Sequence, residues 1–438
     1  MTGRILRIEI HRSVAPWTAL GAALVGTALL YVALDGWGGR WMLLALWQRE
    51  YLFILWPMAL GLGAWQAGRD RRCRTEELVA ATARPRWQRV LPAATAMALA
   101  GAAGYVLMYV GGAVQVAAYA SYLPGQSIVI AGVGVLWMVS GVWLGMTVGA
   151  LAPFRLTPPA TAVVGATVAL VAITDRGYAH VPKIVHLLTP SPFGFWGDFV
   201  TVLGRVSVAH TVWLVGLAVS ALASFLCATR TVRMAAALPA VVAAVVALAI
   251  LPDGRQRLPV PDAAATALVC SVGPGPEVCV TRVHVSALAE LRDPARQALA
   301  TMSAKLPQAP TSVHETPESW YETQPTPRPR DVLLVELELA PWGGAKASPD
   351  ELRWRLLDGA GTRPCAYTIG NPDVARANRV ARLAAAAWLA DSAPPDETWQ
   401  VLRAFPAAEQ RDRVAALRRA ALACTEVNLL DLLVGDHS

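Results

Sequence analysis

Seven long apolar runs constrain this chain more than any other feature of its sequence. A helix of roughly 20 apolar residues is long enough to cross the ~30 Å hydrocarbon core of a bilayer. We therefore expect a mainly α-helical, polytopic membrane domain over residues 1–251. The seven runs are Ala15–Leu34, Tyr51–Ala67, Val90–Ala117, Ile128–Ala152, Thr157–Thr174, Ser207–Thr229 and Met234–Leu251.

The composition supports a membrane protein and argues against a nucleic-acid partner. Of the 438 residues, 55% are hydrophobic and only 16% are charged, whereas a soluble domain carries about a quarter charged residues. Residues 1–251 hold 18 Lys and Arg against 8 Asp and Glu, while residues 252–438 hold 20 against 23. The basic charge therefore belongs to the flanks of the apolar runs, and we expect no nucleic-acid binding.

An arginine-rich stretch between the second and third runs sets the expected orientation. Gly68–Arg89, which we call the arginine segment, contains seven arginines. A short loop rich in arginine resists translocation, so it is expected on the cytoplasmic side of the plasma membrane. Over the whole domain this arrangement puts 13 basic residues inside and five outside. The amino terminus is then cytoplasmic, and seven spans put the carboxyl-terminal domain, residues 252–438, outside the cell.

Two parts of this topology are less regular. Trp41–Trp47 is apolar but is followed directly by Arg49 and Glu50, so we expect it to form an interfacial or re-entrant approach to the second span, with Arg49 in an outer loop. The sixth and seventh spans are separated only by Arg230–Arg233. If that tight hairpin does not form, the carboxyl-terminal domain is cytoplasmic instead.

The interior of the spans is expected to lack charge. Its polar side chains are Gln66, Tyr105, Tyr109, Gln115 and His210, with no Asp, Glu, Lys or Arg at the centre of a predicted span. A proton or ion path is therefore not indicated, because such paths use ionisable groups within the membrane.

The long outer loop from residue 175 to 206 is mostly apolar and rich in proline, and we expect short helices lying at the outer surface.

One predicted span carries small residues on one face. Gly141, Gly145 and Gly149 recur every fourth residue, a spacing that lets a neighbouring helix backbone approach closely. This face predicts helix packing, either within the chain or in a dimer. The alternative is a chance recurrence in a glycine-rich segment.

The carboxyl-terminal region has the pattern of a small α/β domain. Val278–Val285 and Asp331–Leu339 have the composition of strands, and the sequence becomes helical from Pro372 onward. An exported domain with an even number of cysteines is typically disulfide-bonded, although buried free thiols are the alternative. A local Cys270–Cys279 bridge would leave Cys365 to pair with Cys424, while four cysteines allow three pairings.

The motifs of common enzymes are absent from the sequence. No G-x-x-x-x-G-K-[ST] phosphate loop or G-x-S-x-G elbow occurs, and His314-Glu315 is followed by Thr316-Pro317 and lacks the second histidine of a zinc peptidase. We therefore expect no catalytic residue, no metal and no cofactor.

The arginine segment also has features of a docking element. Thr75 can cap a helix and the two following glutamates favour its first turn, so a helix is predicted over Thr75–Ala83, ended by Pro85. A peripheral partner could bind this helix, or the segment could only orient the chain. The candidate partner-binding residues are Arg69, Arg71, Arg72, Arg74, Glu76, Glu77, Leu78, Arg84 and Arg86.

The arginine segment contains the sequence G-R-D-R-R-x-R-T-E-E-L-x-A-A-T-x-R-P-R-W. This sequence resembles the membrane subunits of type 2 ABC exporters. More narrowly, it resembles an actinobacterial permease-like group with an extra final span and an extracytoplasmic tail. The resemblance, which covers residues 1–233, implies that the arginine segment contacts a separate ATPase subunit and that Val181–Gly204 forms an outer gate. It also implies a homodimer or a second permease. The seventh span and large tail depart from typical exporters, so the alternative is a non-transporting membrane anchor that displays a binding or sensing domain.

Overall fold

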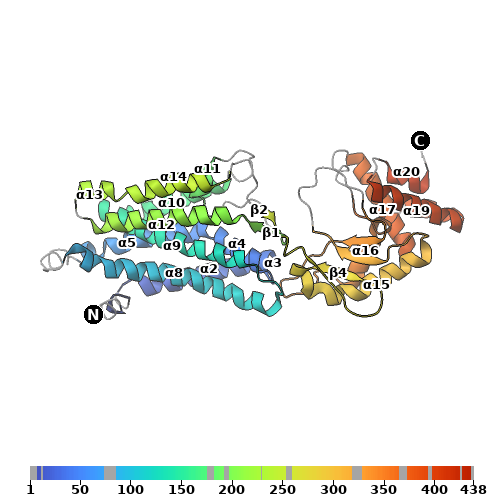
Figure 1. Ribbon diagram of the computed structural model, residues 1–438, viewed down its shortest axis with the longest axis horizontal. Helices are drawn as coiled ribbons and strands as arrows, with labels where there is room; N and C mark the ends of the chain where they lie inside the picture. The colour runs from blue at the N-terminus through green and yellow to red at the C-terminus, as the bar shows by residue number, and fades with distance from the viewer. Residues whose placement is uncertain are drawn as a thin grey trace. The chain divides into compact units, whose positions relative to one another are not determined.

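The computed structural model is mainly helical, and the chain divides into two compact units, Met1–Asp262 and Ala263–Ser438 (Figure 1). Each unit has its own hydrophobic core. The residues that the structure describes are 7–10, 13–73, 85–174, 182–191, 197–227, 229–252, 259–317, 328–364, 372–392, 397–424 and 427–435.

The first unit is a helical bundle. Five of its described helices are long and apolar enough to cross a membrane, and two shorter apolar helices, α5 (Leu52–Ala67) and α10 (Thr157–Thr174), accompany them. The long ones are α2 (Ala15–Val32), α8 (Arg86–Tyr119), α9 (Gly125–Leu151), α12 (Gly204–Leu226) and the stretch Thr231–Ile250, which combines α13 (Arg230–Ala235) and α14 (Leu238–Ile250).

The outer surface of the bundle is apolar. Large hydrophobic side chains are exposed along whole helix faces, as in a membrane protein, since water would make such a surface costly. On α10 and α14 they include Val163, Val164, Leu170, Val241 and Val245.

The glycine face of α9 packs against α5. A Cβ atom at Gly145 would overlap the carbonyl oxygen of Leu60, and one at Gly149 would overlap that of Ala64. At Gly141 it would meet the ring of Trp56. The close approach that these glycines allow is thus made within the chain.

The stretch before α5 is an integral part of the bundle. In α4 (Trp41–Glu50), Leu44 and Leu46 are buried. The helix runs beside α8 in the opposite direction, because the amide of Gly39 bonds the side chain of Gln115 while Gln48 bonds the carbonyl of Tyr105. The expected interfacial or re-entrant approach is thus a buried helix that leads into the second predicted span, and its depth in a membrane stays a prediction.

The two short helices α4 and α5 form one bent element. The α8 and α9 helices are consecutive and antiparallel (Figure 1), α4 is antiparallel to α8, and α5 follows α9 in the same direction along the glycine face. Consequently α4 and α5 run in the same direction, with the bend at Tyr51. Together they are long enough to cross the bundle, which neither helix is alone.

Polar contacts identify one end of the bundle, which we call the arginine end. The Arg69 guanidinium pairs with the Glu9 carboxylate at 3.0 Å. Arg86 donates to the carbonyl of Phe225 at 3.3 Å, and Arg233 donates to that of Cys227 at 3.1 Å. The flanks of the arginine segment, the amino-terminal helix and the connection after α12 therefore meet at this end.

The opposite end is held by contacts between loops. Arg40 pairs with Asp198 at 3.1 Å, and Tyr122 donates to Asp262 at 3.0 Å. Strand β1 (Val200–Val202) pairs antiparallel with β2 (Pro259–Pro261), so the chain leaves the bundle from this end.

The second unit is a small α/β domain. Its sheet has the order β3-β4-β5-β6, in which β3 (Leu268–Cys270) is antiparallel to β4 (Val278–Thr281), while β5 (Ser312–Glu315) and β6 (Val332–Val335) continue parallel to β4. The described helices are η2 (Arg282–Ala287), α15 (Leu288–Lys305), α16 (Pro349–Leu357), η3 (Asp358–Ala360), α17 (Pro372–Ala390), α18 (Glu397–Ala404), α19 (Ala407–Ala423) and α20 (Leu429–Val434).

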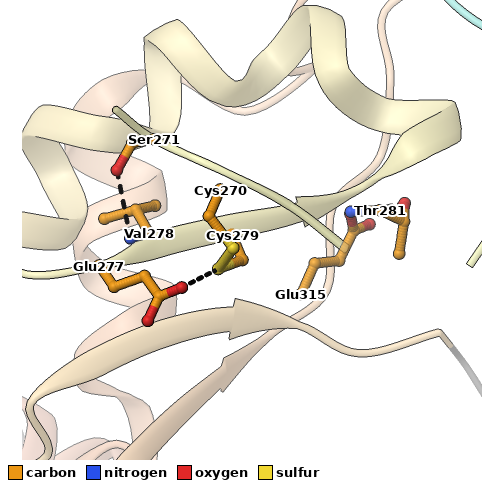
Figure 2. Close-up of a disulfide and its surroundings, with 7 residues drawn as sticks. All are labelled: Cys270, Ser271, Glu277, Val278, Cys279, Thr281 and Glu315. Atoms are coloured by element: carbon orange, nitrogen blue, oxygen red, sulfur yellow. Dashed lines mark hydrogen bonds between the residues drawn. A yellow bond between two sulfur atoms is a disulfide. The ribbon is translucent and has the colours of Figure 1, made fainter. Parts of the chain in front are cut away.

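The predicted local disulfide is present. Cys270 and Cys279 are bonded across the β3–β4 pair (Figure 2), and the connecting loop uses the left-handed backbone of Gly273 and Gly275. Cys424 is also disulfide-bonded, and its predicted partner Cys365 lies outside the described residues.

A buried carboxylate ties the sheet together. Glu315 accepts hydrogen bonds from the amide and the hydroxyl of Thr281, at 2.7 and 2.8 Å, and a third contact comes from Nδ1 of His284. Figure 2 shows Glu315 reaching toward Thr281 from the neighbouring strand. Because both carboxylate oxygens have partners, Glu315 and His284 form a structural link between β4, β5 and η2.

Candidate functional site

The structure describes only the flanks of the arginine segment. Helix α6 (Arg69–Arg72) follows α5 directly, and Arg71 and Arg72 are exposed. The Arg72 guanidinium lies 4.0 Å over the ring of Trp65 and donates to its carbonyl at 2.6 Å. The predicted helix Thr75–Ala83 and the candidate residues Arg74, Glu76, Glu77, Leu78 and Arg84 lie outside the described residues.

The structure also contains a buried polar cluster that the sequence analysis missed. Arg49, at the end of α4, is completely buried. Its Nε donates to the carbonyl of Pro190 at 2.6 Å, and its Nη2 lies 3.2 Å from Nδ1 of His210. Since guanidinium can only donate, Nδ1 of His210 is the acceptor in this contact. We call Arg49, His210 and the carbonyls they bond the Arg49 cluster.

The hydrogen bonds of His210 define its protonation. With Nδ1 accepting from Arg49, the ring proton sits on Nε2, which donates to the carbonyl of His186 at 3.0 Å. A neutral imidazole next to a fixed cation is the expected state, because a second buried positive charge would repel the first.

The position of the cluster contradicts the expected distribution of charge. Gln48, the neighbour of Arg49, bonds the carbonyl of Tyr105, which lies near the middle of α8. Arg49 therefore lies inside the bundle and not in an outer loop, and the expectation of an interior without charged residues is wrong. A charged residue in an apolar stretch predicts the end of a span, whereas α4 contains Arg49 because the guanidinium donors are bonded.

The segment that accepts these bonds, residues 182–191, is partly buried in the bundle, with Ile184 and Leu188 exposed. It contains α11 (Lys183–Leu188), which packs against α10, α12 and α14. Leu187, Thr189 and Ser191 are almost completely buried. The expected short helix is therefore present in this part of the loop, and one side of it packs on the bundle, since its carbonyls bond Arg49 and His210. Its place at the outer membrane surface stays a prediction.

Aromatic side chains surround the cluster. The Trp137 ring lies edge-on to Trp56 at a centroid distance of 5.4 Å, and 6.4 Å from the ring of His210. Tyr105 occupies the space left by Gly134, where a Cβ atom would overlap its ring. The cluster is thus a cation held in apolar surroundings, where electrostatic interactions are strong.

One group with ligand-like spacing does not form a metal site. The ligand atoms of Cys270, Glu277 and Cys279 lie within 4.8 Å of one another. However, the two sulfurs are bonded to each other, so the thiolates that a metal requires are consumed.

Comparison with protein-family models, curated proteins and solved structures finds no match for this chain.

Proposed function

We propose that this chain is the membrane subunit of a type 2 ABC exporter and forms an export path with a separate ATPase subunit. The proposal rests on the amino-acid sequence of the arginine segment, the apolar helices of the first unit and the Arg49 cluster. A second copy or another permease would complete the path, contacting the exposed apolar faces of α10 or α14.

The proposed topology has seven crossings. They are α2, the bent α4–α5 element, α8, α9, α10, α12 and α13–α14. The arginine end faces the cytoplasm, because its basic residues disfavour translocation. The second unit is then extracytoplasmic, in agreement with its disulfides, which persist in oxidising compartments.

The observation that carries the proposal is the bonding of segment 182–191, which is partly buried, to Arg49 and His210. The segment falls within Val181–Gly204, the region that the resemblance associates with an outer gate, and it is bonded to α4 through Arg49 and to α12 through His210. Because α5 leads directly from the arginine segment to this cluster, motion imposed there by an ATPase would reach the bonds at Pro190 and His210. Coupling of this kind requires two arrangements of the cluster, one bonded and one released.

Co-expression with an ABC ATPase subunit from the same genome tests the proposal. Arg71→Glu combined with Arg72→Glu should abolish co-purification and stimulation of ATP hydrolysis, because both side chains are exposed at the arginine end. Arg205→Glu, an exposed charge reversal at the opposite end, is the matched control. Unchanged association and ATPase activity in the double variant would contradict the proposal.

A membrane anchor that displays the second unit is the alternative. It is favoured by the separate core of that unit and by a cavity in it. Under this hypothesis a deletion phenotype is restored by any membrane anchor joined to residues 263–438, whereas an exporter subunit requires its own helical unit.

A further inference from the structure

A cavity of about 710 Å³ lies in the second unit, at the carboxyl end of β6. One wall is formed by α17 and another by α16 and the residues after η3, while Ala421 and Leu429 contribute from α19 and α20. Ligands of parallel sheets commonly bind beyond the carboxyl ends of the strands. The volume suits a small organic molecule.

The lining of the cavity carries excess positive charge. It holds four arginines against two carboxylates, Glu336 and Asp358. Arg382 is buried and donates to Asp358 at 2.5 Å, and Arg363 pairs with Glu336. By contrast, Arg379 is exposed and makes no hydrogen bond or ion pair with the described residues, so its charge is available to a ligand.

A buried amide beside Arg379 lacks an acceptor. Asn378 is only 4% exposed, and its Oδ1 accepts from the amide of Leu429 at 2.8 Å. Its Nδ2 has no hydrogen-bond partner. Buried donors are rarely left unbonded, and an oxygen of a bound ligand would supply what this one lacks.

Apart from Thr362, the remaining side chains of the lining are apolar. Trp354, Leu334 and Leu383 face the same cavity. A ligand that complements both parts has an anionic head for Arg379 and Asn378 and a hydrophobic body. We propose that this cavity binds a small amphiphilic organic anion, such as a carboxylate attached to an aromatic or aliphatic group. The site is separate from the proposed export path and does not depend on it.

Dansylphenylalanine and its neutral amide form a matched pair of probes. Full-length protein in phosphatidylcholine nanodiscs is titrated with each, and the fluorescence of empty nanodiscs is subtracted. The acid should bind about tenfold more tightly than the amide, because only the acid brings a negative charge to the guanidinium of Arg379.

Two variants test the assigned residues. Asn378→Asp keeps the oxygen that bonds Leu429 but replaces the free donor, and Arg379→Gln removes the unpaired charge. Each should weaken binding of the acid by about tenfold, and Arg379→Gln should change binding of the neutral amide by less than about twofold. Arg379→Lys should retain most of the affinity. Arg376→Gln is the control, since Arg376 is exposed on the same helix but does not line the cavity.

Several outcomes would overturn the proposal. They are a lack of saturable binding of the acid, equal affinity for acid and amide, or equal behaviour of Arg379→Gln and Arg376→Gln. Competition by inorganic phosphate as strong as that by the acid would show that the apolar lining has no role. Arg379→Gln alters an exposed side chain, so it decides the question even if Asn378→Asp fails to fold.

Discussion

Buried arginines occur in both units, and their partners differ. Arg418, in α19, is 4% exposed and donates to three carbonyls, those of Ala360 at 2.8 Å, Gly361 at 3.1 Å and Arg330 at 2.8 Å. Arg49 in the helical unit donates to the carbonyl of Pro190 and to the ring of His210. Each arginine thus joins segments distant in the sequence.

Arg418 and Arg49 differ in the segments that carry their hydrogen-bond acceptors. The carbonyls around Arg418 come from η3 and the approach to β6, which are fixed by the core of the second unit. Burial lowers the pKa of Arg418 to about 10, which leaves it charged at neutral pH. The acceptors of Arg49 belong to a short, partly buried segment and to the ring of His210 in α12. We infer that Arg418 stabilises the core of its unit, while Arg49 holds a connecting segment against the helices.

The largest effect on stability is expected for Arg418→Met. The variant leaves three buried carbonyls without their donor, and breaking buried charged interactions costs about 3–5 kcal/mol. Hydrogen–deuterium exchange of the full-length protein should show faster exchange throughout α19 and η3. Protection equal to the wild type would mean that Arg418 is not a structural residue of the second unit.

Gly145→Ala measures how much the close packing of α5 on α9 contributes to the stability of the helical unit, apart from its hydrogen bonds. A methyl group there meets the Leu60 carbonyl, so α5 and α9 must separate, and overpacking of this kind costs about 1–3 kcal/mol. The thermal midpoint in detergent should fall. Gly132→Ala, on the same helix with nothing within 4 Å of the added atom, should leave it unchanged. Equal midpoints for the two variants would contradict the packing of α5 on α9.

Arg49→Met should have a smaller effect on stability and a distinct effect on accessibility. The loss of one or two hydrogen bonds in a helical membrane bundle costs roughly 1–2 kcal/mol. The bonds at Pro190 and His210 also hold segment 182–191, so a cysteine introduced at Thr189 should react faster with a water-soluble maleimide in the Arg49→Met background. Arg49→Lys keeps the charge and should restore part of the protection. Equal rates in all three backgrounds would show that Arg49 does not restrain this segment.

The apolar helices were predictable, because length and hydrophobicity are local properties of the sequence. Arg49 was misplaced because a charged residue conventionally ends a span. Two signals could have corrected this placement. Trp41–Trp47 and Leu52–Ala67 form one helix-length stretch if a single interruption is allowed, and His210 within the sixth run offers a polar partner. The acceptors of Arg49 were not predictable, since the fold alone brings Pro190 to α4.

The cavity of the second unit was predictable only in part. Ala375, Asn378, Arg379 and Arg382 recur at helical spacing and so share one face of α17. The opposite walls come from β6, α16 and the residues after η3, which are brought together by tertiary packing. The helix α15, which packs against β4, was also not predicted, because its hydrophobic pattern is interrupted by Pro294.

The smallest effect on stability is expected for Arg355→Ala. This variant tests whether an arginine stabilises the second unit because it is buried or merely because it is paired. Arg355 pairs with Glu351 at 2.7 Å, but the two side chains are 41% and 51% exposed. Solvent screens such a pair, and ion pairs of this spacing on a helix contribute about 0.3–0.5 kcal/mol. Exchange of α16 in Arg355→Ala should therefore match the wild type within error, whereas Arg418→Met should not. If the two variants destabilise the second unit equally, the exposure of an arginine does not determine its contribution to stability. The different effects expected for Arg418 and Arg49 could then not be explained by the surroundings of the two side chains.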